Sequence, residues 1–344
     1  MKRKGLRDPR VWLGLAVSSF FAYLAFGDMD PRAVAGALGK ADYRFLPFAF
    51  VLTYGVLWVR AKRWKVLLGA VLEVKTGLLF RVTLIGFLAN YVLPARIGEV
   101  VRAALLAARE NMSVSAALGS VVLERLLDLM SILLIFSILY LLDSMPAPDS
   151  ELGSILHRAA LLFLVVAVFI AVTVWFLGSR TKRAVWLVEK ALGSIGPKMA
   201  SRLASAVFSF AQGLRLPSGL KAMSEVCFWT LGLWVLSALI VILIMETFRL
   251  DLPWSTAWFV LVALGFGVSV PSAPGFVGTF HFAAMGALLF FGVDKDSALS
   301  FALVLHAICI FPVIFLGIPI LWAEGMSLGL IPRLSGNEPS DPKK

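Results

Sequence analysis

Six charged residues stand close together in an otherwise apolar part of the sequence. They are Arg96, Glu99, Arg102, Glu124, Arg125 and Asp128. The first three are spaced at i, i+3 and i+6, and Glu124 and Asp128 at i, i+4, so each set can share one face of a helix. A charged side chain at the centre of a membrane helix costs about 2.5–3.5 kcal/mol even on the lenient insertion scale. These charges must therefore pair with one another, face water or bind a charged ligand.

Two interpretations of these six charges remain open. The three arginines and three carboxylates sum to zero, so they can form a self-neutralising structural network. Arginine also suits phosphate, because its planar fork binds two oxygens at once. The sequence therefore predicts either buried ion pairs alone or ion pairs that surround an anionic, phosphate-bearing ligand.

A second group of polar residues lies in the C-terminal half. Ser269, Ser272 and Thr279 supply hydroxyl groups, and the backbone N–H groups at the start of the following helix suit an anion. His281 lies on that helix, and His306 lies in the last apolar run. Each histidine can titrate or simply hydrogen-bond a neighbour, and the sequence leaves both readings open.

The elements that carry these residues are predicted to be membrane helices. Hydrophobic residues make up 60% of the 344-residue chain and charged residues 15%. A soluble domain of this composition would expose large apolar patches. We predict an all-α integral membrane protein, a single transmembrane domain over residues 1–344, with about six full spans. These spans are Val11–Phe26, Phe45–Val59, Leu118–Leu142, Ala159–Leu177, Val226–Met245 and Ala298–Trp322.

Two further apolar regions, residues 78–108 and 254–291, are interrupted by proline and glycine. The interrupting residues are Pro94, Gly98, Pro271, Pro274, Gly275 and Gly278. The second arm of the first region, Ala95–Ala108, would span only about 21 Å as a helix, too little to cross upright. We predict two re-entrant hairpins, although two full spans would also fit the second region.

The distribution of Lys and Arg orients these elements in the membrane. Basic residues gather in Met1–Arg10, Arg60–Arg81 and Ser179–Glu225, and the alternate connections are more acidic. Because basic loops face the cytoplasm, both termini are expected there. The two broken regions would then enter from opposite faces. Residues 179–222 are expected to form a basic amphipathic helix on the cytoplasmic leaflet or a solvated linker.

The two broken regions also resemble each other in sequence. Pro94 precedes Gly98 by the same four positions that separate Pro274 from Gly278. Inverted repeats with discontinuous helices are a recurrent design of secondary transporters. Broken backbone at membrane depth needs protein or a water-filled cavity to satisfy its polar groups. We interpret the pair as a transport site, and the alternative is a pair of packing hairpins without a ligand.

Other classes of site find no support in the sequence. The basic cytoplasmic segments account for the net charge of +11, so nucleic acid is not expected as a partner. Cys227 and Cys309 lie in apolar runs, and no His or Cys spacing typical of a metal site occurs. No Walker motif is present. We therefore expect no cofactor, no metal and no catalytic constellation.

Three stretches together resemble a known family. They are residues 90–102 (NYVLPARIGEVVR), 123–128 (LERLLD) and 271–280 (PSAPGFVGTF). Over nearly the whole chain the sequence resembles the transmembrane domain of the lysylphosphatidylglycerol synthases, a family of flippase-like proteins. The resemblance implies movement of a membrane phospholipid or a polyprenyl-phosphate-linked lipid across the membrane. His281 stands where the family usually has Glu, and we expect no soluble aminoacyltransferase domain of the kind that the synthases carry. We therefore do not expect this chain to make lysylphosphatidylglycerol itself.

We predict a translocase for an anionic, phosphate-bearing lipid, a multi-pass protein of the cell inner (cytoplasmic) membrane. Two alternatives remain: an accessory or scaffold subunit of a lipid or cell-envelope synthesis enzyme, and a membrane-embedded lipid-modifying transferase. The transferase would need a nucleophile or a metal-bound water. A protein partner from lipid or envelope synthesis is compatible with the translocase and the accessory subunit. The candidate substrate-binding residues are Asn90, Arg96, Glu99, Arg102, Glu124, Arg125, Asp128, Ser272, Thr279 and His281.

Overall fold

The protein is built from helices. The computed structural model describes residues 9–27, 29–93, 96–142, 151–179, 197–270 and 272–325, and within these ranges it contains no strand. The all-α prediction is therefore confirmed for this part of the chain. The α-helices are α1 (Pro9–Phe26), α2 (Pro31–Lys40), α3 (Leu46–Leu68), α4 (Thr76–Val92), α5 (Gly98–Glu110), α6 (Val114–Leu141), α7 (Glu151–Ser179), α9 (Pro197–Gly213), α10 (Leu220–Thr247), α11 (Ser255–Gly267), α12 (Thr279–Phe290) and α13 (Lys295–Ala323).

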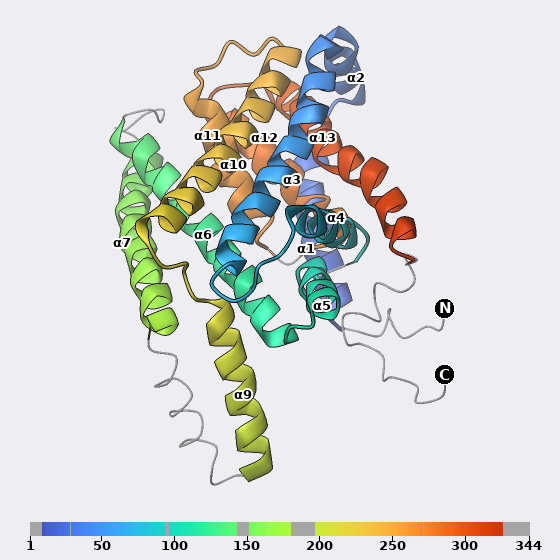
Figure 1. The fold of residues 1–344 in the computed structure, drawn as a ribbon. Helices are drawn as coiled ribbons and strands as arrows, with labels where there is room; N and C mark the ends of the chain where they lie inside the picture. Colours follow the sequence, from blue (N-terminus) through green and yellow to red (C-terminus); the bar gives the residue numbers. More distant parts are fainter. Residues whose placement is uncertain are drawn as a thin grey trace.

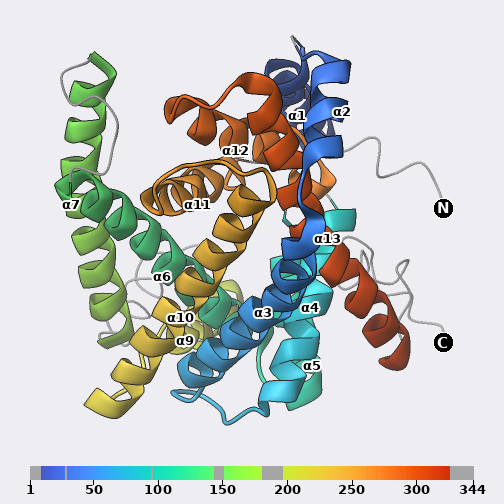
Figure 2. The ribbon, with the colours of Figure 1, turned by 90° about the horizontal axis from the view of Figure 1, so that it is seen from above.

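Three described helices are long and apolar enough to cross a membrane. They are α3 with the short 3-10 turn η2 (Tyr43–Phe45) that precedes it, α10 and α13. The three pack against one another, with α3 and α10 side by side near the centre of the molecule (Figures 1 and 2). Their length and composition make this a multi-pass membrane protein.

Proline inside α13 leaves polar backbone that the neighbouring helix satisfies. Pro312 has no N–H group, so the carbonyl of Ile308 lacks its helical partner. The hydroxyl of Thr53 on α3 shares its proton between the carbonyl of Ala49 at 3.0 Å and that of Ile308 at 3.4 Å. Tyr54 donates to the carbonyl of Pro312 at 3.0 Å. Contacts of this kind allow a proline to remain within a membrane helix.

Each of the two regions interrupted by proline and glycine forms a pair of short helices. In the first, α4 and α5 pack against each other, and in the second α11 packs against α12. The break of the second contains the 3-10 turn η3 (Pro274–Phe276). Helices α5, α11 and α12 have 13, 13 and 12 residues. Each is therefore about 18–20 Å long, shorter than a hydrocarbon core of about 30 Å. Two of the predicted break residues, Pro94 and Pro271, lie outside the described residues.

The two breaks meet inside the molecule. Arg96, in the first break, donates from Nη1 to the backbone carbonyl of Val268 at 3.3 Å. Its guanidinium also lies 5.9 Å from the ring centroid of Phe276 in η3. Tyr91, at the end of α4, donates to the carbonyl of Cys309 on α13 at 3.0 Å. The broken segments of the two halves thus contact each other, as a shared transport site between them requires.

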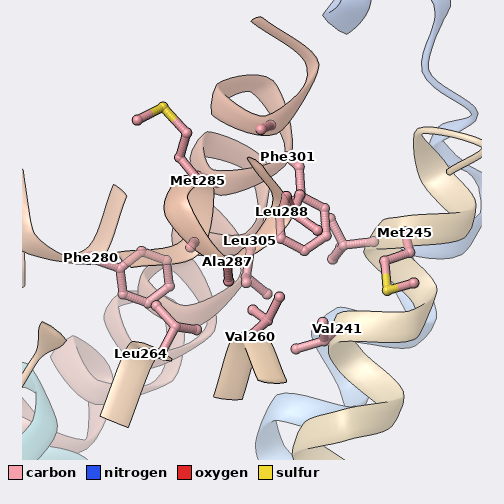
Figure 3. Packing of buried hydrophobic residues seen from close by; sticks show 14 of the residues in the cluster. Val241, Met245, Val260, Leu264, Phe280, Met285, Ala287, Leu288, Phe301 and Leu305 are labelled. Atoms are coloured by element: carbon pink, nitrogen blue, oxygen red, sulfur yellow. The ribbon is translucent and has the colours of Figure 1, made fainter. Parts of the chain in front are cut away.

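The largest apolar core supports the second broken segment. It joins α10, α11, α12 and α13, and Phe301 and Leu288 in its middle are fully buried (Figure 3). A second core joins α3, α4, α5 and α13 around Trp64 and Leu88. The helices that carry the charged residues, α3, α5 and α6, all contribute apolar side chains to this second core.

Helices α6, α7 and α9 flank this centre. α6 packs on α7 and on α9, and α9 extends away from the bundle in Figure 1. The contact with α9 is close, because a Cβ on Gly119 would collide with the carbonyl of Phe210. Residues 180–196 of the predicted basic segment lie outside the described residues, and the remainder of that segment contains α9.

One helix runs further than the sequence predicted. We expected a span over Phe45–Val59 followed by a basic cytoplasmic loop, but α3 continues to Leu68. Arg60 and Arg63 are therefore helical residues, and the side chain of Arg63 is fully buried. A prediction from hydropathy places the end of a span at the first charged residues. It contains no information on the carboxylates of another helix that neutralise those charges.

Candidate functional site

Helices α3, α5 and α6 bring eight charged side chains together. Their members, called the arginine cluster below, are Arg60 and Arg63 on α3, Arg96, Glu99 and Arg102 at and near the start of α5, and Glu124, Arg125 and Asp128 on α6. All six charged residues that the sequence singled out belong to it. Arg60 and Arg63 are additional members.

Glu124 is the centre of the arginine cluster. Its side chain is fully buried, and its Oε1 atom lies 2.8 Å from nitrogens of both Arg60 and Arg125. The Oε2 atom lies 3.0 Å from Nη2 of Arg102. Nη2 of Arg63 approaches Oε1 to 3.5 Å. One carboxylate thus joins arginines from all three helices.

Asp128, one turn further along α6, forms ion pairs with two arginines of α3. Its oxygens lie 2.6 Å from Nη2 of Arg63 and 2.9 Å from Nη1 of Arg60. Arg125 approaches it to 3.2 Å. The i, i+4 spacing of Glu124 and Asp128 therefore does what the sequence predicted: it presents two carboxylates on one face of a helix.

The arginine cluster is not neutral. Its five arginines and three carboxylates leave a net charge of +2. The six residues identified in the sequence sum to zero, and Arg60 and Arg63 from α3 add the excess charge. A signal for both existed in the sequence: their i, i+3 spacing matches one face of a helix, and the acidic pair Glu124 and Asp128 required partners.

Aromatic rings complete the surroundings of two arginines. The guanidinium of Arg102 lies 4.7 Å from the ring of Trp64, and that of Arg60 lies 5.5 Å from the ring of Phe87. Trp64 itself donates from its indole to the hydroxyl of Ser120 at 3.0 Å. Cation–π contacts stabilise charge without neutralising it, so the excess of +2 remains.

A cavity of about 520 Å³ opens beside the cluster. Arg60, Arg96, Arg102 and Arg125 line it, together with Glu99, Asp128 and apolar side chains. The Nε atoms of these four arginines are buried and have no partner among the described residues. Buried N–H donors cost free energy when left unsatisfied. The arginines therefore place positive charge at the cavity wall, while their Nε atoms are covered by protein.

Arg96 is the member that reaches from one half of the protein to the other. It occupies the left-handed region, with φ of 55°, at the entrance to α5. Its side chain is 28% exposed and pairs with Glu99 at 3.2 Å. A non-glycine residue in this conformation stores strain, and such strain is often found at functional sites.

Asn90 positions the first break. It is buried, and its Oδ1 atom accepts a hydrogen bond at 2.8 Å from the backbone N–H of Gly98, the first residue of α5. It also lines the cavity. Asn90 thus holds the start of α5, which carries Glu99 and Arg102.

Replacing Gly98 with alanine should disrupt this arrangement. A Cβ at Gly98 would collide with the carbonyl of Gly86 on α4 and would lie 2.6 Å from Oδ1 of Asn90. Overpacking of this kind costs about 1–3 kcal/mol. We expect a lower thermal unfolding midpoint in detergent. Gly77→Ala is the matched control, because nothing lies within 4 Å of its Cβ. Equal midpoints for the two variants would contradict the close approach of α4 and α5.

The candidates of the second broken segment are placed differently. Ser269 lines the cavity, and its hydroxyl donates to the carbonyl of Gly265 at 2.6 Å. Ser272, Thr279 and His281 are not among the lining residues. Thr279 donates to the carbonyl of Phe276 at 3.2 Å. The hydroxyl of Ser272 is buried without a partner among the described residues. The second segment therefore contributes Gly265, Val268, Ser269, Phe276 and Phe280 to the cavity wall, and α13 contributes His306.

The glycines of this segment have conformations that other residues rarely adopt. Gly275 has φ of 71° and Gly278 has φ of 92°. A Cβ on Gly278 would also collide with the carbonyl of Ser18 on α1. The backbone of the second break is thus shaped by glycine and packed closely against α1.

Residues 11–317 match the family model described as the lysylphosphatidylglycerol synthase TM region. The chain belongs to this family. The match extends from α1 into α13 and includes every member of the arginine cluster. Family membership gives the chain a function related to membrane lipid. No curated protein and no solved structure was found to match it.

Proposed function

We propose that this chain translocates a lipid with an anionic, phosphate-bearing headgroup across the inner (cytoplasmic) membrane. One observation carries the proposal: the arginine cluster has a net charge of +2 and forms part of the wall of a cavity. Uncompensated buried charge costs several kcal/mol. A phosphate that enters the cavity would supply the missing negative charge and accept hydrogen bonds from the guanidinium groups that line it.

A neighbouring groove favours a lipid over a soluble phosphate. It has a volume of about 600 Å³, lies between α6 and α10, and is lined by apolar residues such as Met130, Leu134 and Leu231. Trp234 lines both this groove and the cavity of the arginine cluster. An amphipathic ligand could therefore place its phosphate among the arginines and a hydrocarbon tail in the groove.

In this proposal the two broken segments are re-entrant hairpins that enter from opposite faces, and both termini are cytoplasmic. The short lengths of α5, α11 and α12 support the hairpins. The contact of Arg96 with Val268 supports a meeting point inside the membrane. Six full spans would place α1, α3, α6, α7, α10 and α13 across the bilayer.

We propose movement of the lipid without its chemical conversion. Glu99, Glu124 and Asp128 are each ion-paired with at least one arginine. A carboxylate that holds arginines in place is a poor general base, because proton uptake would break the pairs. The carboxylates therefore fit a role in positioning the phosphate-binding arginines.

Reconstituted protein tests the proposal directly. Proteoliposomes would contain trace phosphatidylglycerol with a fluorescent label on one acyl chain, and dithionite would bleach the label on the outer leaflet. We expect the protein to make the inner-leaflet label accessible. Phosphatidylcholine with the same label is the matched control, because its headgroup has no net charge and should move more slowly. Protein-independent bleaching, or equal rates for both lipids, would contradict the proposal; the former result would favour the accessory-subunit alternative.

A further inference from the structure

His281 and His306 form a buried hydrogen-bonded pair that the lipid site does not use directly. His281 lies on α12 and His306 on α13, and their exposed fractions are 4% and 6%. Nδ1 of His306 lies 3.2 Å from Nε2 of His281. The pair is enclosed by aromatic rings: Phe280 stacks on His306 at 4.4 Å, and Phe26 of α1 meets the edge of His281.

The pair is attached at both ends to the second break. Nε2 of His306 lies 2.8 Å from the carbonyl of Gly275. The backbone N–H of Gly278 points at Nδ1 of His281, at 3.4 Å. His281 is the third residue of α12, so it takes the helix-capping role that Glu or Gln fills in a capping box.

These contacts fix the position of every proton on the two rings. A neutral imidazole has one donor and one acceptor nitrogen. Since Nδ1 of His281 accepts from Gly278, its Nε2 must carry the proton and donate to Nδ1 of His306. Nε2 of His306 then carries the second proton and donates to the carbonyl of Gly275. Both rings are neutral, and all four nitrogens have a partner.

One additional proton must break the same hydrogen bond wherever it binds. If His281 takes the proton, its Nδ1 becomes a donor and faces the N–H of Gly278. If His306 takes it, Nε2 of His281 must accept, so the proton of His281 moves to Nδ1 and meets the same N–H. In both cases Gly278 is released, and Gly278 is the glycine that begins α12 and packs against Ser18.

His306 also lines the cavity of the arginine cluster. A positive charge on the pair adds to the +2 already there, so a bound anion favours the proton and the proton favours the anion. Other charged residues on the cavity wall are Arg60, Arg96, Glu99, Arg102, Arg125 and Asp128, and its other titratable residues are Tyr91 and Cys309.

In sequence, α11 carries no charged or titratable residue, and α12 carries His281 alone. The remaining charged or titratable residues on the described parts of the helices packed around α12 and α13 are Arg10 and Tyr23 on α1, Arg32 and Lys40 on α2, Tyr54, Lys62, Arg63 and Lys65 on α3, Arg81 on α4, Lys221, Glu225, Cys227 and Glu246 on α10, and Lys295 and Asp296 at the start of α13. Asp296 is ten residues from His306, about 15 Å along the helix. Members of the arginine cluster share a cavity wall with His306, so they are the charged groups that a proton on the pair would affect.

We propose that His281 and His306 form a proton-binding site, and that a proton binds there together with the anionic headgroup. This inference rests on the proposed function and adds to it a coupling ion. Binding of the proton would free Gly278 at the start of α12, so occupation of the lipid site and rearrangement of the second break would occur in the same step. The gradient that drives transport would then be a proton gradient.

Proton uptake on lipid binding tests the coupling. Dioctanoyl phosphatidylglycerol, whose phosphate stays ionised across the range used, would be added to weakly buffered protein in micelles. We expect uptake of up to one proton per lipid. The affinity should rise between about pH 8 and about pH 5.5, by at most tenfold per pH unit, since one proton is linked to one lipid. For each variant we compare the affinity at low pH with the affinity of the same variant at high pH. A substitution that weakens binding equally at both pH values therefore leaves this ratio unchanged.

Variants assign the effect to the pair. The variant His281→Asn/His306→Gln keeps polar groups near Gly278 and Gly275 but cannot bind a proton, and we expect its uptake and its affinity ratio to disappear. His157→Gln, which replaces the chain's third histidine, should retain both. Arg96→Ala should bind less lipid at both pH values while keeping the ratio.

A measurement that needs no change in the pair covers the case in which the double variant does not fold. In His157→Gln, His281 and His306 are the only histidines, and ¹⁵N NMR of their imidazoles should show two neutral rings that become charged when lipid is added. Binding without proton uptake, or neutral rings in the bound state, would overturn the coupling and leave the lipid site intact. Absence of binding at both pH values would overturn the lipid site and the coupling with it.

Discussion

Replacing Arg96 with alanine is expected to lower the rate of anionic-lipid movement by roughly 10- to 150-fold, since a hydrogen bond to a charged group contributes about 1.5–3 kcal/mol. Arg96 lines the cavity, its Nε atom has no partner, and it contacts the second break through Val268. Its side chain is among the more exposed of the cluster, at 28%. Loss of Arg96 should therefore impair the site with little effect on folding. The measurement is the dithionite assay with labelled phosphatidylglycerol.

Two companion variants sharpen this result. Arg96→Lys keeps the charge but loses the planar fork, so it should recover only part of the rate. Arg44→Ala is the matched control. Arg44 is exposed, pairs with Asp42, and neither lines the cavity nor belongs to the arginine cluster. A well-folded Arg96→Ala protein with the wild-type rate would remove Arg96 from the mechanism.

Much of the framework was predictable because membrane helices follow simple physical rules. Hydropathy identified α3, α10 and α13, and proline with glycine marked the breaks between α4 and α5 and between α11 and α12. Charges that are costly in a bilayer marked the six residues from Arg96 to Asp128. Each of these signals depends only on residues that are close together in the sequence, so a single sequence is enough to detect it.

The parts that sequence reasoning missed depend on contacts between distant helices. Arg60 was assigned to a loop because only its pairing with Glu124 and Asp128, more than sixty residues away, makes it stable inside the protein. Thr279 was a candidate for the anion site, but its hydroxyl satisfies a carbonyl of its own turn. The histidine pair could not be foreseen, since nothing in the spacing of His281 and His306 indicates that the two rings meet.

The second large effect is expected from Glu124→Gln, which should destabilise the protein by about 3–5 kcal/mol, the usual cost of removing one partner from a buried ion-pair network. Glu124 is fully buried and approaches four arginines. The glutamine has nearly the same shape, so lost charge, and not lost volume, is the cause. The thermal midpoint and the fraction of monodisperse protein after extraction would both fall. Glu73→Gln, at an exposed position, should leave both unchanged.

A second substitution separates charge from geometry. Glu124→Gln leaves five arginines against two carboxylates, a net charge of +3, whereas Glu124→Gln/Arg63→Met returns the cluster to +2. Arg63 is fully buried and does not line the cavity, and Asp128 keeps Arg60 and Arg125 as partners in its absence. We therefore expect the double variant to be more stable than the single one, with a coupling of at least about 1 kcal/mol in a double-mutant cycle. Additive losses would mean that the cluster acts through individual contacts, and the net charge of +2 would no longer be the reason to expect an anion in the cavity.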